Sequence, residues 1–329
     1  MMKSIGICIP TYKRPIFLRQ CIESAVHSAN GCPIEIYVAD DSVSDINRDV
    51  LDELCQKYSF IKVFYNKKNL GIDENIKNIV DLCACDYAWI IGEDDIFLPN
   101  AIERAWNVIQ KRSDQFIFSA YQYVSEDHSQ VSKIIRISKI DCLIDMRTFV
   151  AESLWAIGFI GAVIVSKESW KKSRSDLYAG TYFSHVGQIV DMISNADNLF
   201  ALAEPGVANR AQGADVFTWK KDSFGVFTGF ERMCEIASEN NENLREELNK
   251  AIASYRRAVG YLSFKTTFRL RYQGSFDIRQ FKTYLIKSKN VSLCRKIWLL
   301  TLALTPRLFL SPFAELYMYI AKRRMLRSS

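Results

Sequence analysis

The chain has 329 residues, of which 49% are hydrophobic and 24% are charged, so it can fold around a substantial core and is not generally disordered. The formal net charge is +6, and four positive charges fall within residues 322–327, which leaves the remainder near balance. Nucleic-acid-binding proteins more often carry a basic stripe through the fold, whereas a local basic tail beside apolar residues favours an anionic membrane surface as partner. The nine cysteines include no C-x-x-C pair, which favours reduced core thiols.

The N-terminal third alternates segments typical of strands with segments typical of helices. Short apolar runs predict strands at residues 4–9, 34–39, 61–65 and 87–91. Apolar residues at helical spacing predict helices after Pro15, Gly71 and Pro99. Because strands alternate with helices, we predict an α/β fold with a mostly parallel sheet flanked by helices.

The remaining sequence is less regular. We predict strands at residues 116–120 and 161–165, a helix at 186–193, and a helical pattern from about residue 230 onward. The predicted domains are therefore a catalytic domain over residues 1–215 and a helical C-terminal region over residues 216–329. Within the catalytic domain, residues 1–100 form a nucleotide-binding half and residues 101–215 an acceptor half.

The C-terminal region contains apolar segments that are interrupted by proline. Residues 297–304 and 308–321 are apolar, and the basic residues 322–324 follow them. This pattern is typical of helices that lie in a membrane interface, and a helical cap packed on the main domain is the alternative. No run of about twenty uninterrupted apolar residues and no export signal is seen, so we expect a cytoplasmic protein held peripherally at the inner face of the cytoplasmic membrane.

Acidic residues follow two of the predicted strands. Asp40 and Asp41 come after the second strand, and Glu93, Asp94 and Asp95 come after the fourth. The carboxyl ends of parallel strands share one edge of the sheet, which is where ligands bind in such folds. Neighbouring carboxylates repel each other, and Mg²⁺ or Mn²⁺ together with a diphosphate would relieve that repulsion. An acidic turn that starts a helix is the alternative.

Three common classes of enzyme are excluded by missing motifs. The sequence has no G-x-G-x-x-G after the first predicted strand and no G-x-x-x-x-G-K-[ST], which argues against dinucleotide dehydrogenases and P-loop enzymes. It also has no G-x-S-x-G, the motif of many serine hydrolases.

Four segments, in the same order along the chain, resemble the inverting nucleotide-sugar glycosyltransferases of family 2, which have a GT-A fold. Residues 5–14 resemble the family's first strand and loop, and residues 40–42 the acidic end of its second strand. Residues 66–71 resemble its asparagine–leucine–glycine stretch, and residues 89–99 its metal-binding segment. Residues 163–170 and 180–186 are similar to bacterial O-antigen enzymes of the abequosyltransferase kind.

The resemblance implies roles for the matched positions. Asp94 would bind the metal, Mg²⁺ or Mn²⁺, with support from Asp95, and Asp40 would accept a hydrogen bond from the base. The family often has aspartate at the position of Gly92, and we expect Glu93 to lie near the ribose in its place. The donor nucleotide would contact Pro10, Thr11, Tyr12, Arg14, Asp40, Asp41, Asn69, Gly71 and Glu93.

The catalytic base is expected near residue 185. Many members of the family carry a glutamate–aspartate pair before the helix that supplies the base, whereas this chain has residues 180–186 there. We predict His185 as the general base, because histidine titrates near neutral pH. Two alternatives stay open: His185 is a further metal ligand with Asp191 or another acid as the base, or His185 is structural.

These observations predict an inverting glycosyltransferase that moves a sugar from a nucleotide-sugar to a glycan acceptor. We expect a lipid-linked acceptor, a role in bacterial O-antigen or capsule synthesis, and no nucleic-acid partner. A sugar nucleotidyltransferase is one alternative, although it favours a glycine-rich loop after the first strand, which residues 10–14 lack. A catalytically inactive glycan-binding module is the other.

Overall fold

The protein is described from a computed structural model, which covers residues 2–125, 130–210, 223–286, 288 and 291–310. The chain divides into two compact units, Met1–Val216 with Arg232–Ser254 and Phe217–Glu231 with Tyr255–Ser329. Residues 232–254, which the sequence pattern groups with the C-terminal region, thus belong to the first unit. The predicted basic tail, and the apolar segment before it from residue 311 on, lie outside the described residues.

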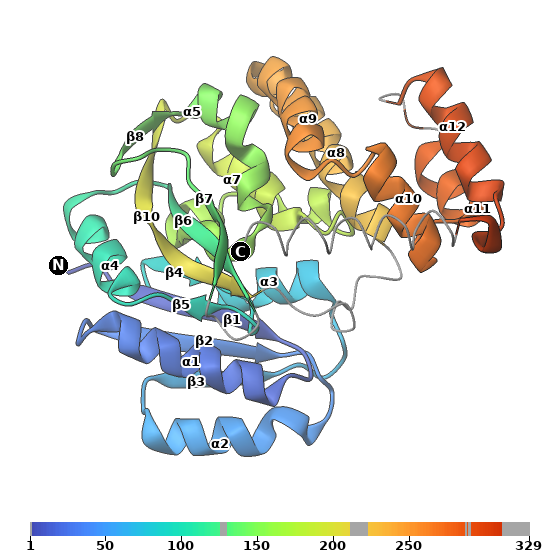
Figure 1. Ribbon diagram of the computed structural model, residues 1–329. Coiled ribbons are helices and arrows are strands. Elements are labelled where there is room, and N and C mark those ends of the chain that lie inside the picture. The colour runs from blue at the N-terminus through green and yellow to red at the C-terminus, as the bar shows by residue number, and fades with distance from the viewer. Residues whose placement is uncertain (1, 126–129, 211–222, 287, 289–290, 311–329) are drawn as a thin grey trace. The chain divides into compact units, whose positions relative to one another are not determined.

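The first unit is built on one mixed sheet with the strand order β3-β2-β1-β4-β9-β6-β10-β5, in which β7 pairs with β6 and β8 with β10 (Figure 1). The strands β1 to β4 are parallel to one another, which confirms the predicted parallel arrangement in this half. The strand β9 runs antiparallel to β4 and β6, so the other half is mixed. The strands are β1 (Ile5–Thr11), β2 (Ile34–Asp40), β3 (Ile61–Tyr65), β4 (Tyr87–Ile90), β5 (Ile96–Phe97), β6 (Phe116–Val124), β7 (Val131–Ile135), β8 (Cys142–Asp145), β9 (Val163–Ser166) and β10 (Asn198–Arg210).

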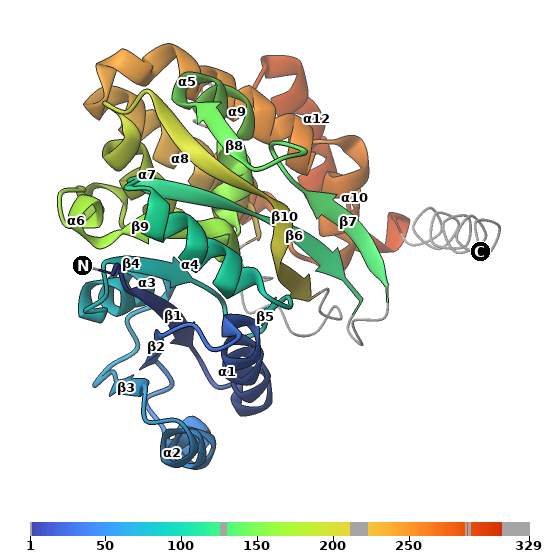
Figure 2. The same ribbon diagram turned by 90° about the vertical axis from the view of Figure 1, so that its left-hand side faces the viewer.

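Helices flank this sheet on both faces. Figure 2 shows α1 and α3 on opposite sides of the parallel strands. Every residue of β1 is buried, as expected for a strand covered on both faces. The helices are α1 (Pro15–Ala29), α2 (Arg48–Lys57), α3 (Ile72–Leu82), α4 (Ala101–Lys111), α5 (Met146–Thr148), α6 (Lys167–Trp170), α7 (Ser184–Ile193), α8 (Ser223–Asn240), α9 (Arg245–Val259), α10 (Phe264–Gln273), α11 (Ile278–Gln280) and α12 (Leu293–Leu304).

The strand order reverses direction between β1 and β4. The chain passes from β1 through α1 to β2 on one side, and then returns through α3 to β4 on the other side of β1. In open α/β sheets such a reversal leaves a crevice beyond the carboxyl ends of the two strands, and ligands bind there. A ligand is therefore expected to bind at the loops that follow β1, β2 and β4.

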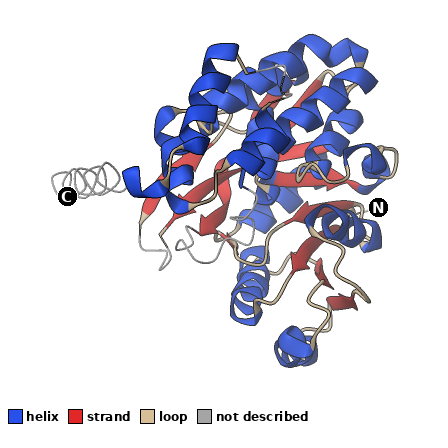
Figure 3. Cartoon of the chain, turned by 90° about the vertical axis from the view of Figure 1, so that its right-hand side faces the viewer, coloured by secondary structure: helices blue, strands red, loops and turns tan. Residues whose placement is uncertain are grey.

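The described residues of the second unit form helices joined by short turns and loops, as in the helical parts of Figure 3. Its core contains a buried Glu231 carboxylate that accepts hydrogen bonds from Arg256 and Tyr261. The aromatic rings of Phe224 and Phe276 pack beside this group, with their centroids 4.6 Å apart. Within the described part of the chain, no helix combines the length and the apolar character needed to cross a bilayer.

Candidate active site

The loops after β1 and β2 are tied together at the reversal point. Thr11 pairs with Asp40 in the parallel register of the two strands. The backbone N–H of Asp41 donates to the carbonyl of Thr11 at 3.0 Å, and the N–H of Lys13 donates to Ser42 Oγ at 2.8 Å. Lys13 adopts a left-handed backbone with a φ of 58°. These bonds fix the two loops side by side.

Only one of the two Asp40 carboxylate oxygens is hydrogen-bonded to a described residue. Its Oδ1 accepts from the backbone N–H of Ser42 at 2.9 Å and from Asn47 Nδ2 at 3.1 Å. Its Oδ2 is buried and has no hydrogen-bond partner among the described residues, and the same holds for the neighbouring Thr11 Oγ1. A buried polar atom without a partner is costly, so a ligand that donates to Oδ2 would gain from this arrangement. Asn47, which orients Asp40, was not predicted from sequence.

Asp41 holds the Asn69–Gly71 turn in place. Its carboxylate accepts from the backbone N–H groups of Leu70 and Gly71 at 2.7 and 3.0 Å. It also accepts from Asn66 Nδ2 at 3.1 Å, and Asn69 donates to its carbonyl at 3.3 Å. Gly71 has a φ of 79°, which favours glycine. The structure thus brings the predicted residues Asn69 and Gly71 to the end of β2 through Asp41.

The predicted residues on the β1 loop differ in exposure. Pro10 is buried at the end of the strand, whereas the Tyr12 side chain is exposed. The Lys13 ammonium lies 5.0 Å from the centre of the Tyr12 ring. Arg14 points across the reversal point to the loop after β4, where its guanidinium lies 2.5 Å from Asp94 and 3.7 Å from Glu93.

The acidic segment after β4 is crowded around Gly92. A Cβ atom at this position would lie 3.0 Å from Asp94 Oδ1 and 3.2 Å from Asp95 Oδ2. The larger side chain of an aspartate, which the resemblance leads us to expect here, would therefore require these carboxylates to move. Glycine at position 92 is compatible with the observed placement of Asp94 and Asp95.

Burial makes the acidic segment a favourable place for a cation. Burial first, and then the charge of Asp94, raise the pKa of Glu93, while Arg14 opposes this shift. The same two causes raise the pKa of Asp95. Both shifts mean that the surroundings disfavour the ionised carboxylates, which a bound cation would stabilise. The donor set of carboxylate oxygens suits Mg²⁺ or Mn²⁺.

The protein does not itself provide a complete ligand set in the part that is described, where no three His, Cys, Asp or Glu side chains gather as a metal centre. Mg²⁺ usually takes only one or two carboxylates and completes its shell with water and substrate phosphates. Asp94 and its acidic neighbours therefore fit a cation that is shared with a phosphorylated ligand.

Arg210 is a second positive group beside the acidic segment. It ends β10, and it lowers the pKa of Asp95 against the larger effect of burial. Its guanidinium donates to Gln20 at 2.7 Å and lies 4.6 Å from the centre of the Phe17 ring. Arg210 could not be predicted from a local pattern, because its partner Gln20 on α1 lies 190 positions away in the chain.

His185 lies at the start of α7, which begins on a carboxylate cap. Asp73 accepts from the backbone N–H groups of Tyr182 and Ser184 at 2.9 and 3.3 Å. The His185 ring is 1% exposed, its Nε2 lies 3.0 Å from the carbonyl oxygen of Ile157, and its Nδ1 has no partner among the described residues. Burial lowers the pKa of His185, so the ring is neutral at neutral pH. Since a carbonyl can only accept, Nε2 carries the proton and Nδ1 has the free lone pair.

Asp191 lies further along α7 and is surrounded by donors. Its carboxylate accepts from Tyr178 at 2.8 Å, from Arg174 at 2.8 Å and from Asn241 at 2.9 Å. The side chain is 5% exposed. These contacts connect α7 to the segment before it and to the turn after α8, so Asp191 has a structural role.

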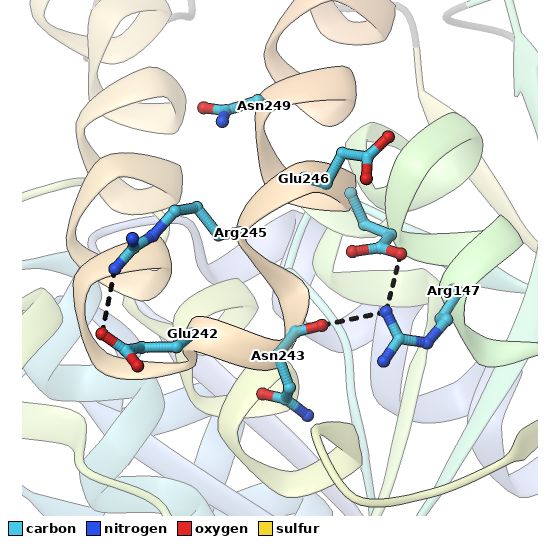
Figure 4. A pocket seen from close by; sticks show the side chains of 7 residues that line it. Arg147, Glu242, Asn243, Arg245, Glu246 and Asn249 are labelled. Atoms are coloured by element: carbon cyan, nitrogen blue, oxygen red, sulfur yellow. Dashed lines mark hydrogen bonds and ion pairs between the residues drawn. The ribbon is translucent and has the colours of Figure 1, made fainter.

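A separate pocket lies elsewhere on the first unit and contains none of the predicted site residues (Figure 4). Its charges are paired with one another: Arg147 lies 2.8 Å from Glu247, and Arg245 lies 3.2 Å from Glu242. These surface charges are neutralised by one another. The reversal point, where the buried Thr11 Oγ1 and Asp40 Oδ2 have no partner among the described residues, is therefore the better candidate for the active site. The pocket is lined by Arg147, Glu242, Asn243, Arg245, Glu246, Glu247 and Asn249.

Comparison with known proteins connects this site to one family. Residues 6–158 match the description "Glycosyl transferase family 2". The abequosyltransferase RfbV of Salmonella typhimurium is 25% identical over 195 residues, which are 55% of this chain and 59% of RfbV. The matches span about half the length of the curated relatives.

Solved structures confirm the predicted fold. The S. aureus protein TarS (residues 1–349), in complex with UDP-GlcNAc, superposes with a TM-score of 0.58 at 12% identity, over 85% of this chain and 81% of that one. The mannosyltransferase PcManGT of Pyrobaculum calidifontis, in complex with GDP-Man and Mn²⁺, gives a TM-score of 0.53 at 11% identity, over 92% of this chain and 79% of that one. At these identities the likeness establishes the GT-A fold alone.

Proposed function

We propose, on the match of residues 6–158 to glycosyl transferase family 2, that this chain transfers a sugar from a nucleotide-sugar to a glycan acceptor. One observation carries the proposal: the Asp40 oxygen that has no partner among the described residues and the acidic segment after β4 lie at the carboxyl ends of β2 and β4, the parallel strands on either side of β1. A nucleotide-sugar offers N–H donors on its base and a negatively charged diphosphate. The two halves of the site match these two halves of the ligand.

Within this site we assign the base to the β2 side and the diphosphate to the β4 side. Asp40 Oδ2 accepts a hydrogen bond from the base, and Thr11 and Arg14 line the nucleotide pocket beside it. Asp94, supported by Asp95 and Glu93, is the residue that would hold Mg²⁺ or Mn²⁺. When bound, such a cation would neutralise the charge of the departing diphosphate. The complex of PcManGT with GDP-Man and Mn²⁺ supports this choice of ligands.

We propose that the transfer inverts the anomeric carbon. The acceptor oxygen forms its bond to this carbon on one face, while the bond to the diphosphate breaks on the other and its electron pair leaves with the diphosphate. The acceptor proton passes to a general base. His185 is the candidate, because its neutral ring has an unprotonated Nδ1, and Asp191 is the alternative.

The acceptor and the cellular site are part of the same proposal. We propose a lipid-linked glycan acceptor, used in bacterial surface-polysaccharide synthesis, with the enzyme held peripherally at the inner face of the cytoplasmic membrane. The similarity to an abequosyltransferase and the basic character of the C-terminal sequence support this placement.

Replacement of Asp40 tests the nucleotide half of the site. Asp40→Asn keeps the Oδ1 acceptor for Ser42 and Asn47 but replaces Oδ2 with an amide that cannot accept. We expect it to weaken binding of the preferred nucleoside diphosphate by about 1–3 kcal/mol, the cost of a lost charge-assisted hydrogen bond. Asp40→Ala should lose a similar amount, and calorimetry with uridine, thymidine, cytidine and guanosine diphosphates measures both.

The matched control is Asp45→Ala, because Asp45 is exposed on the same loop and pairs with Arg48. This variant should bind nucleotide like the wild type. If Asp40→Asn retains full affinity while Asp40→Ala loses it, the carboxylate only shapes the loop and does not contact the base.

A further inference from the structure

Positive charge is concentrated in residues 255–329, a segment much longer than the basic tail at residues 322–327. Residues 255–329 contain 16 Lys and Arg but 2 Asp and Glu, whereas residues 1–254 contain 27 Lys and Arg and 35 Asp and Glu. The chain therefore combines a net charge of −8 in its first 254 residues with +14 in its last 75. Among the described residues from 255 onward, Asp277 is the one acidic side chain beside ten basic ones. The positive charge cannot be neutralised within this segment.

The helix α12 in the same segment turns an apolar stripe toward solvent. Leu293, Ile297 and Leu304 are 73%, 57% and 61% exposed. Their spacing places them on one side of the helix, while Leu299 and Leu302 are buried on the other. An apolar helix face is normally buried, yet no described residue covers this stripe of α12.

The neighbouring helix α10 extends this stripe with aromatic rings. Phe264 is 64% exposed, and its ring centroid lies 5.9 Å from that of Phe268 and 5.2 Å from that of Trp298 on α12. The exposed basic residues Lys265 and Arg269 follow the two phenylalanines on α10. We call the resulting surface the α10–α12 face, formed by Phe264, Phe268, Leu293, Ile297, Trp298 and Leu304.

We propose that the α10–α12 face docks on an anionic membrane surface. The helix α12 has 12 residues and is roughly 18 Å long, too short to span a bilayer but suited to lie in its interface. There the Leu, Ile and Phe side chains enter the acyl boundary, tryptophan sits at the headgroup level, and Lys and Arg meet anionic headgroups. A nucleic acid would match the charge but not the exposed aliphatic stripe.

Self-association through this face is disfavoured by its charge. Two copies placed face to face would bring two strongly basic segments together, which costs free energy through like-charge repulsion. The biological use of this docking rests on the proposed function, because docking would bring the enzyme to a lipid-linked acceptor. Its physical basis, the exposed apolar stripe and the net charge, does not depend on the chemistry at Asp94.

Vesicle flotation of the full-length protein tests the proposal. We expect binding to phosphatidylcholine vesicles that contain phosphatidylglycerol, weak binding to phosphatidylcholine alone, and loss of binding as salt is raised. Ile297→Glu with Leu304→Glu should lower the partition constant about tenfold or more. Lys265→Glu with Arg269→Glu should do the same for the anionic vesicles.

The controls change similar residues in the first unit. Ile140→Glu alters an isoleucine that is 71% exposed, and Lys172→Glu alters a lysine side chain that is 71% exposed. Both should float like the wild type, and all variants should keep their unfolding temperature and nucleotide affinity. Nucleotide affinity also separates the two proposals. If neither the wild type nor any variant binds a nucleotide, the proposed glycosyltransferase activity is wrong. If the α10–α12 face variants float like the wild type, the proposed docking face is wrong.

Two further outcomes would overturn the proposal. If Lys322→Gln, Arg323→Gln and Arg324→Gln together abolish flotation while the face variants float normally, the anchor is the tail. If light scattering shows that wild type is a dimer and that Ile297→Glu with Leu304→Glu is a monomer, a second copy covers the face. If only the face variants lose flotation, with all proteins in the same oligomeric state, the docking face is established.

Discussion

Asp94→Asn is expected to lower cation-dependent sugar transfer by about a hundredfold or more, because it removes a negative charge where the diphosphate and its cation should meet. The amide has nearly the shape of the carboxylate, so the fold should survive. In the wild type, Mn²⁺ should raise the unfolding temperature in the presence of a nucleoside diphosphate, and Asp94→Asn should abolish this effect. Transfer rates and thermal unfolding measure the two consequences separately.

The matched control for Asp94 is Asp114→Asn. Asp114 also pairs with an arginine, Arg112 at 2.7 Å, but lies outside the site. This variant should transfer sugar at the wild-type rate. Wild-type turnover in Asp94→Asn, or full wild-type activity in excess EDTA, contradicts the assignment of a cation to this residue.

His185→Ala is expected to reduce turnover by roughly a hundredfold or more while donor and cation bind normally, if His185 is the base. Loss of cation affinity as well would identify His185 as a metal ligand. Because the ring is buried against the carbonyl of Ile157, His185→Gln distinguishes a third role. Glutamine can still donate to that carbonyl but cannot act as a base, so recovery of turnover in His185→Gln would mean that the histidine is structural.

The pH dependence gives His185 an independent signature. Burial lowers its pKa below the usual 6.5, so the acid limb of the rate profile should lie below pH 6.5. Folding stability should also fall as the pH drops below 6.5, because the unfolded chain then takes up the proton more readily than the folded one. In His185→Gln, folding stability should fall less steeply as the pH drops below 6.5. His27→Ala, which changes an exposed histidine on α1, should leave the profile unchanged.

The parallel half of the sheet could be predicted because each strand is a short apolar run closed by a polar or acidic residue. The strand β10 was missed for a physical reason. It contains Pro205 and Gly206, which normally argue against a strand, and its pairing with β6 shifts register between Leu202 and Val207. The strands β5, β7 and β8 are short or largely exposed and have no strong apolar pattern.

Part of the candidate site could also be predicted from the sequence. The carboxylates at the ends of β2 and β4 could be placed together, because parallel strands end at one edge. The different contacts of Asp41 and Asp40 could not be predicted. Asp41 holds the turn at Gly71, whereas Asp40 keeps one oxygen that no described residue contacts through a hydrogen bond. The contributions of Asn47 and Arg210 depend on tertiary contacts, which leave no local pattern in the sequence.

We propose that the loops at the carboxyl ends of β1, β2 and β4 bind a nucleotide-sugar together with a divalent cation. Thermal unfolding of the wild type with Mn²⁺ and a panel of UDP-, dTDP-, CDP- and GDP-sugars tests it most directly, with Asp40→Asn and Asp94→Asn measured alongside. We expect at least one donor to raise the unfolding temperature of the wild type. Both variants should lose this rise, while their unfolding temperatures without ligand stay close to that of the wild type. A folded wild type that no nucleotide-sugar stabilises, or stabilisation that persists in both variants, would contradict it.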